Sequence, residues 1–165
     1  MKSKKYVLVV VLLLALSCMF AIFCFSSQDS SSTNILSKNI TRKIAGTIFE
    51  DYKSMDIDFQ NKITNELNLF IRKTAHFSLY FFMSMLIYIV FALWKKRFFI
   101  SGVISVSICC VYAMLDEFHQ SFVPGRTPLV KDVIIDTSGA ILGTVFCFMI
   151  ISSVKFIIGN IKSHE

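Results

Sequence analysis

The fold is decided by a stretch in the second half of the chain, Tyr112 to Gly143, which reads YAMLDEFHQSFVPGRTPLVKDVIIDTSGAILG. It places many ionisable side chains in an otherwise apolar sequence. A charged side chain within a membrane span costs at least about 2.5 kcal/mol, so it usually pairs with another group or lines a functional site. The segments on either side are apolar enough to cross a bilayer. The stretch therefore predicts a site of ionisable groups at one end of a helical membrane bundle.

The composition is that of a polytopic membrane protein. Of the 165 residues 55% are hydrophobic, and the mean hydropathy is +0.64. A membrane helix needs about 20 mostly apolar residues. We therefore expect an all-α fold in one domain, residues 1–165, with four transmembrane helices joined in part by an amphipathic extracytoplasmic connector. The expected spans are about residues 6–25, 70–94, 98–118 and 128–151, with the connector at about 26–69.

The first expected span follows a basic start, Met1 to Lys5. A cleaved signal peptide also begins with basic residues, but its apolar region is only about 7–15 residues long. The run from Tyr6 to Phe25 is longer, which favours an uncleaved anchor. The alternative of a lipoprotein-type cleavage before Cys18 is weakened because the apolar run continues beyond that cysteine.

The connector contains two helical patterns. Leu36, Ile40, Ile44 and Ile48 recur every four residues, which predicts one amphipathic face. A second helical segment is expected to begin near Asp58. These helices could lie on the membrane surface or cover the outer end of the bundle, either as a packed connector or as an element that binds a partner.

The basic residues predict the topology and the partners. They gather at the amino terminus, in Lys95-Lys96-Arg97, and at Lys155 and Lys162. With four spans these regions share one side, so the positive-inside rule predicts a multi-pass protein of the cell membrane with both termini in the cytoplasm. The net charge of +6 flanks apolar runs rather than forming a basic stripe with stacking aromatics. We therefore expect the lipid bilayer as a partner and no nucleic acid.

Polar side chains recur at helical spacing near the outer end of the second span. Arg72, His76 and Tyr80 stand at i, i+4 and i+8, so they share one helix face, and Lys73 lies beside them. A lone histidine is more often a structural hydrogen-bonding group. Three polar groups in register with an arginine favour a site.

The third and fourth spans repeat this arrangement. Tyr112, Asp116 and Gln120 are again spaced i, i+4 and i+8, with Glu117 turned about 100° around the helix. The sequence Val123-Pro124-Gly125-Arg126 then predicts a turn.

Along the fourth span, two aspartates and two glycines share a face: Asp132, Asp136, Gly139 and Gly143. The last two form a Gly-x-x-x-Gly spacing, which lets membrane helices approach closely. Close approach there would bring the aspartates toward the second and third helices.

We call the predicted site the polar cluster. Its members are Arg72, Lys73, His76, Tyr80, Tyr112, Asp116, Glu117, Gln120, Arg126, Asp132 and Asp136. With Lys131 included, the basic and acidic groups of this end balance, so salt bridges that merely let the polar residues fold into the bundle are one complete explanation.

Several chemistries remain open for the polar cluster. A metal site is conceivable, but no HExxH or other compact ligand spacing supports one, so we expect no metal and no cofactor. Carboxylates with a histidine could perform acid–base catalysis, whereas no GxSxG nucleophile motif is present. Arg72 and Arg126 would suit a phosphate or a carboxylate, because guanidinium binds both through two hydrogen bonds.

The order of these residues resembles the VanZ-like family. The matching pattern begins with FSSQ at 25–28 and continues with Arg72-Lys73-x-x-His76-x-x-x-Tyr80 and Tyr112-x-x-x-Asp116-Glu117-x-x-Gln120. It ends with Val123-Pro124-Gly125-Arg126, Asp132-Val133 and Gly139-x-x-x-Gly143. The resemblance extends from the first span through the fourth, and so many polar residues in order make it specific.

The resemblance implies a small integral membrane protein, with the family's named member linked to resistance to the glycopeptide teicoplanin. We therefore expect a non-enzymatic protein that lowers glycopeptide susceptibility by binding or shielding an envelope component. Its partner would be an anionic or lipid-linked envelope molecule or the glycopeptide itself. The alternative is a membrane enzyme that acts on a lipid or lipid-linked envelope precursor through acid–base or metal-assisted chemistry. A transporter is disfavoured because no inverted repeat or pair of broken helices is evident.

Overall fold

A computed structural model describes residues 2–27, 33–95 and 97–162 of the chain. All regular structure in these residues is helical. The elements are α1 (Lys2–Ser26), α2 (Thr33–Ile48), the 3₁₀ helix η1 (Tyr52–Ser54), α3 (Ile57–Lys95), α4 (Phe98–Gln120) and α5 (Val130–Lys162). Four of them, α1, α3, α4 and α5, are long and apolar enough to cross a membrane. The all-α class and its four membrane-spanning helices are thereby confirmed, while residues 28–32 of the expected connector lie outside the described residues.

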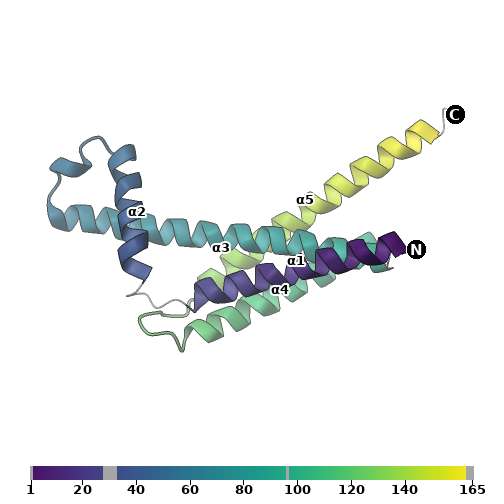
Figure 1. Ribbon diagram of the computed structural model, residues 1–165, viewed down its shortest axis with the longest axis horizontal. Coiled ribbons are helices and arrows are strands. Elements are labelled where there is room, and N and C mark those ends of the chain that lie inside the picture. Colours follow the sequence, from purple (N-terminus) through teal and green to yellow (C-terminus); the bar gives the residue numbers. More distant parts are fainter. Residues whose placement is uncertain (1, 28–32, 96, 163–165) are drawn as a thin grey trace.

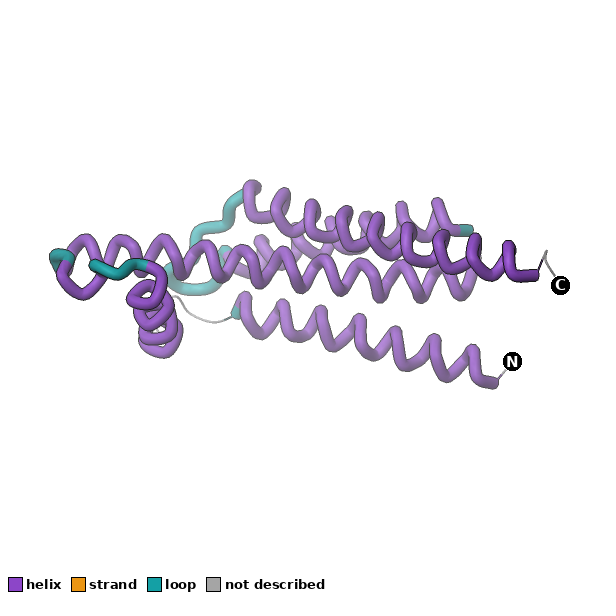
Figure 2. The backbone as a smooth tube through the Cα atoms, turned by 90° about the horizontal axis from the view of Figure 1, so that it is seen from above, coloured by secondary structure: helices purple, strands orange, loops and turns teal. Residues whose placement is uncertain are grey.

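The long helices alternate in direction along one axis (Figure 1). α1 and α4 run toward one end of the bundle, and α3 and α5 return from it, so the start of α1 and the end of α5 lie at the same end. Figure 2 shows the same arrangement from above, with the short helix α2 crossing the axis of the bundle. We call the end where α1 and α4 stop and α5 starts the polar end.

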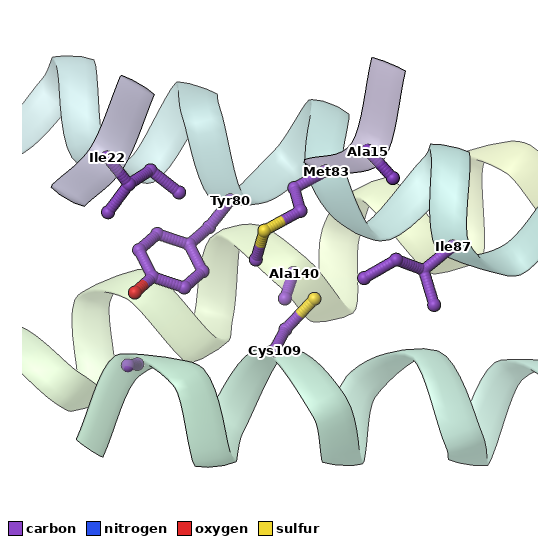
Figure 3. Close-up of a cluster of buried hydrophobic side chains, with 8 residues drawn as sticks. Ala15, Ile22, Tyr80, Met83, Ile87, Cys109 and Ala140 are labelled. Carbon is purple, nitrogen blue, oxygen red and sulfur yellow. The ribbon is translucent and has the colours of Figure 1, made fainter. Parts of the chain in front are cut away.

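The interior of the bundle mixes small side chains with a few large ones, including Tyr80. The buried cluster comprises Ala15, Ile22, Tyr80, Met83, Ile87, Cys109, Ala113 and Ala140, so all four long helices contribute to it (Figure 3). The outward faces carry large exposed apolar residues; Phe99, for example, is 83% exposed. Such surfaces suit contact with lipid chains and would be costly in water.

α3 is one continuous helix, whereas the sequence predicted a connector helix followed by a separate span beginning at residue 70. Residues 57–95 contain no glycine or proline, so nothing interrupts the helix at the expected boundary. Its 39 residues extend about 58 Å, roughly twice the thickness of a bilayer's hydrocarbon core. The first part of α3 therefore projects beyond the membrane-spanning region.

The projecting part of α3 carries the remaining connector. The Tyr52 hydroxyl of η1 lies 2.7 Å from Thr64 Oγ1 of α3 in a buried hydrogen bond. The Arg42 guanidinium of α2 donates to Asn61 Oδ1 at 3.1 Å. The described part of the connector is thus packed against α3.

The buried face of α2 is not the predicted isoleucine face. Thr41 and Ala45 are buried, whereas Ile40 and Ile48 are 59% and 60% exposed. Small side chains allow α2 to approach α3 closely. Ile40 and Ile48 remain on the outer surface, Ile44 is partly buried, and the side chain of Leu36 lies outside the described residues. This surface is suited to a membrane interface.

α5 is longer than expected. It continues to Lys162, whereas the predicted span ended near residue 151. Residues 152–161 contain no proline, and the glycine and asparagine that can end a helix come only at 159 and 160.

Candidate functional site

The predicted polar cluster gathers at the polar end of the bundle. Its members come from the middle of α3, the last turns of α4, the loop after α4 and the first turns of α5. α1 also ends here, so its last residues close one side of the site (Figure 1).

Two glycines set how closely α5 approaches α3. A Cβ atom at Gly139 would lie 2.5 Å from the carbonyl oxygen of Phe77, and one at Gly143 would overlap the carbonyl oxygen of Phe81. No residue with a side chain fits at either position without moving the backbone of α3. This contact fixes the register in which the first turns of α5 face α3.

In that register, two acidic side chains of α5 meet two basic side chains of α3. Lys73 forms an ion pair with Asp132. One turn deeper, Nδ1 of His76 lies 3.7 Å from a carboxylate oxygen of Asp136. His76 and Asp136 are both buried, whereas Lys73 and Asp132 are partly exposed. The site is thus more enclosed at His76 and Asp136 than at Lys73 and Asp132.

Asp116 joins α4 to the end of α1. Ser26 Oγ of α1 donates a hydrogen bond to Asp116 Oδ2 at 2.7 Å, and Gln120 Nε2 donates to the same oxygen at 2.9 Å. All three side chains are buried. Two donors on one carboxylate oxygen fix its orientation.

The loop between α4 and α5 is fastened to the helices by two charged side chains. The backbone N–H of Leu129 donates to the Glu117 carboxylate at 2.9 Å. Arg126 Nη2 donates to the carbonyl oxygen of Phe25 at 2.9 Å. Gly125 has φ 74°, a left-handed conformation that glycine adopts without strain, and it turns the chain before Arg126.

Arg126 is close to the other charged groups of this end. Burial lowers the pKa of its guanidinium, and the neighbouring positive charge of Arg72 lowers it further, whereas Asp116 and Glu117 oppose the shift. Since an arginine side chain remains protonated in proteins, these influences act on a permanent charge. Arg72 and Arg126 are thus two cations whose charges act on each other.

A small pocket with a cavity volume of about 10 Å³ lies among these residues. We call it the charged pocket. It is lined by Arg72, Lys73, His76, Glu117, Gln120, Asp132, Ile135 and Asp136. All of these except Ile135 belong to the predicted polar cluster, so the structure brings most of that cluster around one space.

The two tyrosines of the polar cluster lie elsewhere. The Tyr112 hydroxyl donates to the carbonyl oxygen of Met19 at 2.7 Å and so holds α4 against α1. Tyr80 is fully buried, and its ring centroid lies 6.2 Å from that of Tyr112. Neither tyrosine lines the charged pocket.

The sequence from residue 10 to residue 152 matches the VanZ/LLP1 family. The matched range contains every member of the polar cluster and both packing glycines. The chain belongs to the VanZ/LLP1 family. The comparisons with curated proteins and with solved structures find no match.

Ser26 is a site residue of this VanZ/LLP1 protein that spacing arguments missed. Ser26 is far from Asp116 in the sequence, and a serine at the end of an apolar run ordinarily only ends a helix. The one sequence feature that could have indicated Ser26 was the FSSQ segment at 25–28 in the family pattern. Ser26 contacts the site directly, while Gln28 lies outside the described residues.

The VanZ/LLP1 bundle also assembles a group of potential metal ligands. One donor atom each from His76, Asp116 and Asp136 lies within 4.8 Å of the others, and all three residues are buried. They come from α3, α4 and α5, so no local sequence spacing could reveal the group. The site can therefore present cationic groups to an anion at Arg72 and Arg126, and anionic groups to a cation deeper between the helices.

Proposed function

We propose that this VanZ/LLP1 protein binds an anionic group of a cell-envelope molecule in the charged pocket and thereby lowers susceptibility to teicoplanin. The protein acts by binding or shielding that molecule and does not transform it. The observation that carries the proposal is the proximity of Arg72, which lines the charged pocket, and Arg126, whose charges act on each other.

Two guanidinium groups held close together repel each other, and a bound anion relieves that repulsion. Each can bind a phosphate or a carboxylate through two parallel hydrogen bonds. Lys73 also lines the charged pocket and forms an ion pair with Asp132. We assign the two arginines to the ligand, because their charges act on each other.

The size of the charged pocket argues for a small anionic group. Its cavity volume of about 10 Å³ has room for about one water molecule, far below the range of about 300–1,000 Å³ typical of sites that enclose a drug-sized ligand. A glycopeptide antibiotic is much larger and would not fit inside. A phosphate or carboxylate of a lipid-linked or other envelope molecule is the better match.

The same proposal assigns the polar end to the outer face of the membrane. The positive-inside rule supports this orientation, because basic residues gather at the opposite end: Lys4 and Lys5 near the start of α1, Arg97 just before α4 and Lys155 near the end of α5. Both termini then face the cytoplasm, and the charged pocket faces the envelope, where glycopeptides act.

The test is glycopeptide susceptibility in a sensitive host that produces the full chain at matched membrane levels. Wild-type protein should raise the inhibitory concentration of teicoplanin more than that of vancomycin, and Arg72→Ala should abolish the effect. Arg42→Ala is the matched control, since Arg42 is exposed and contacts Asn61 away from the charged pocket. Equal protection by Arg72→Ala and wild type would refute the proposal.

One observation favours a second function, a membrane enzyme that acts on a lipid or lipid-linked precursor. Buried His76 and Asp136 lie 3.7 Å apart, so a small movement would let the carboxylate accept a hydrogen bond from the imidazole, as in acid–base catalysis. Turnover of lipid-linked envelope precursors by purified protein, lost in His76→Gln, would establish this function in place of simple binding.

A further inference from the structure

We propose that His76, Asp116 and Asp136 form a binding site for one divalent transition-metal ion, with Zn²⁺ as the favoured occupant. The site lies between α3, α4 and α5 at the polar end. This proposal is distinct from anion binding in the charged pocket. Metal binding and glycopeptide protection are measured separately, so either proposal can be refuted without the other.

The first support is the geometry of the donor atoms. The three donor atoms lie within 4.8 Å of one another, and the residues are 8%, 4% and 3% exposed in chain order. Tetrahedral ligands of Zn²⁺ at about 2.0–2.2 Å stand roughly 3.4 Å apart. Side-chain movements of about 1 Å would therefore bring these atoms to coordinating distance.

The second support is a buried hydroxyl that lacks a partner. Tyr80 follows His76 by one helical turn on α3 and is fully buried. No described residue forms a hydrogen bond with its hydroxyl. The ring reaches from α3 toward α4 and α5 (Figure 3), and its hydroxyl is close enough to Asp116 and Asp136 to interact with both electrostatically. A buried hydroxyl without a partner is costly, and a metal ion or a metal-bound water would satisfy it.

The third support is an outer shell that already orients one ligand. Ser26 and Gln120 both donate to Oδ2 of Asp116, which fixes the carboxylate and leaves Oδ1 available for a cation. Hydrogen-bonded support of this kind is typical of protein metal ligands. A divalent ion would also neutralise the charges of two carboxylates that are buried between the helices.

The donor set selects the class of metal. One imidazole and two carboxylates suit Zn²⁺ or Mn²⁺. Ca²⁺ requires six to eight oxygen ligands, and Mg²⁺ keeps several waters, so neither fits a buried site with a nitrogen ligand. A purely structural His76–Asp136 ion pair would need neither the free oxygen of Asp116 nor the hydroxyl of Tyr80.

The experiment measures metal bound to the full chain, purified in detergent with an affinity tag that lacks histidine. The protein is stripped with a chelator, dialysed against Zn²⁺, Mn²⁺, Mg²⁺ or Ca²⁺, and analysed for metal by mass spectrometry. We expect about one Zn²⁺ per chain, weaker retention of Mn²⁺ and no retention of Mg²⁺ or Ca²⁺. Zn²⁺ should also raise the melting temperature of the wild-type protein.

Variants separate this site from adventitious binding. His76→Gln and Asp136→Asn should lose the ion and its effect on melting temperature, and Tyr80→Phe should weaken affinity about 10–100-fold. His119→Gln is the control, because His119 lies at the same end but contacts Ser27 and Phe23 instead. Wild-type protein without stoichiometric Zn²⁺ would overturn the proposal, as would undiminished binding in His76→Gln or Asp136→Asn. If Tyr80→Phe bound Zn²⁺ with the affinity of wild type, the Tyr80 hydroxyl would have no role in the metal site.

Discussion

Asp136 on α5 lies 3.7 Å from His76 on α3, and both side chains are buried in the bundle. The glycine one turn farther along α5, Gly139, holds the two helices close enough for this pair to form. The close packing of α3 against α5 thus also sets the geometry of the site. A change in the glycines should therefore affect both stability and function.

Gly143→Ala should destabilise the bundle by about 1–3 kcal/mol, because the added methyl group would overlap the Phe81 carbonyl oxygen and force α5 away from α3. The free energy of unfolding in mixed detergent micelles measures the effect. Gly159→Ala is the matched control: its Cβ would meet no atom within 4 Å, and alanine favours the helix. Equal stability of the two variants would contradict the close α3–α5 contact.

Ser26→Ala should destabilise the folded chain by about 1–3 kcal/mol, since it removes a hydrogen bond to the buried carboxylate of Asp116. The same unfolding measurement applies. Ser17→Ala provides the comparison, because the Ser17 hydroxyl is exposed and bonds only to the Leu14 carbonyl of its own helix. We expect that control to stay within about 0.5 kcal/mol of wild type. A loss in Ser17→Ala as large as that in Ser26→Ala would argue against an anchoring role for Ser26.

Reporter fusions test the proposed orientation. A fluorescent protein fused after the carboxyl end should fluoresce, because that end faces the cytoplasm in our proposal, and alkaline phosphatase fused there should be inactive. A phosphatase inserted after Lys53, in the connector that packs on the projecting part of α3, should be active. The reverse pattern would place the charged pocket on the cytoplasmic side and remove the basis for its contact with the envelope.

Much of this architecture could be predicted from the sequence because the relevant signals are local. Apolar runs of sufficient length predicted four membrane-spanning helices, which the structure contains. Helical spacing placed Arg72 and His76 on one face and Asp132 and Asp136 on another. The bundle then brings these faces together.

Features that depend on tertiary packing could not be predicted from the sequence as well. The helical pattern near Asp58 and the span from residue 70 were interpreted as separate elements, yet without a breaker they form one helix. The pairing of Lys73 with Asp132, and the contact of Ser26 with Asp116, join segments far apart in sequence. For the same reason the group of His76, Asp116 and Asp136 becomes visible only in the folded bundle.

Native mass spectrometry of the full chain, released from detergent after extraction from the membrane, tests the central proposal most directly. Wild-type protein should retain a bound envelope molecule that carries phosphate or carboxylate, because Arg72 and Arg126 supply its counter-charges. Arg72→Gln should lose that adduct, whereas Arg42→Gln, altered outside the charged pocket, should keep it. The same adduct on wild type and on Arg72→Gln, or no anionic adduct on wild type, would contradict binding in the charged pocket.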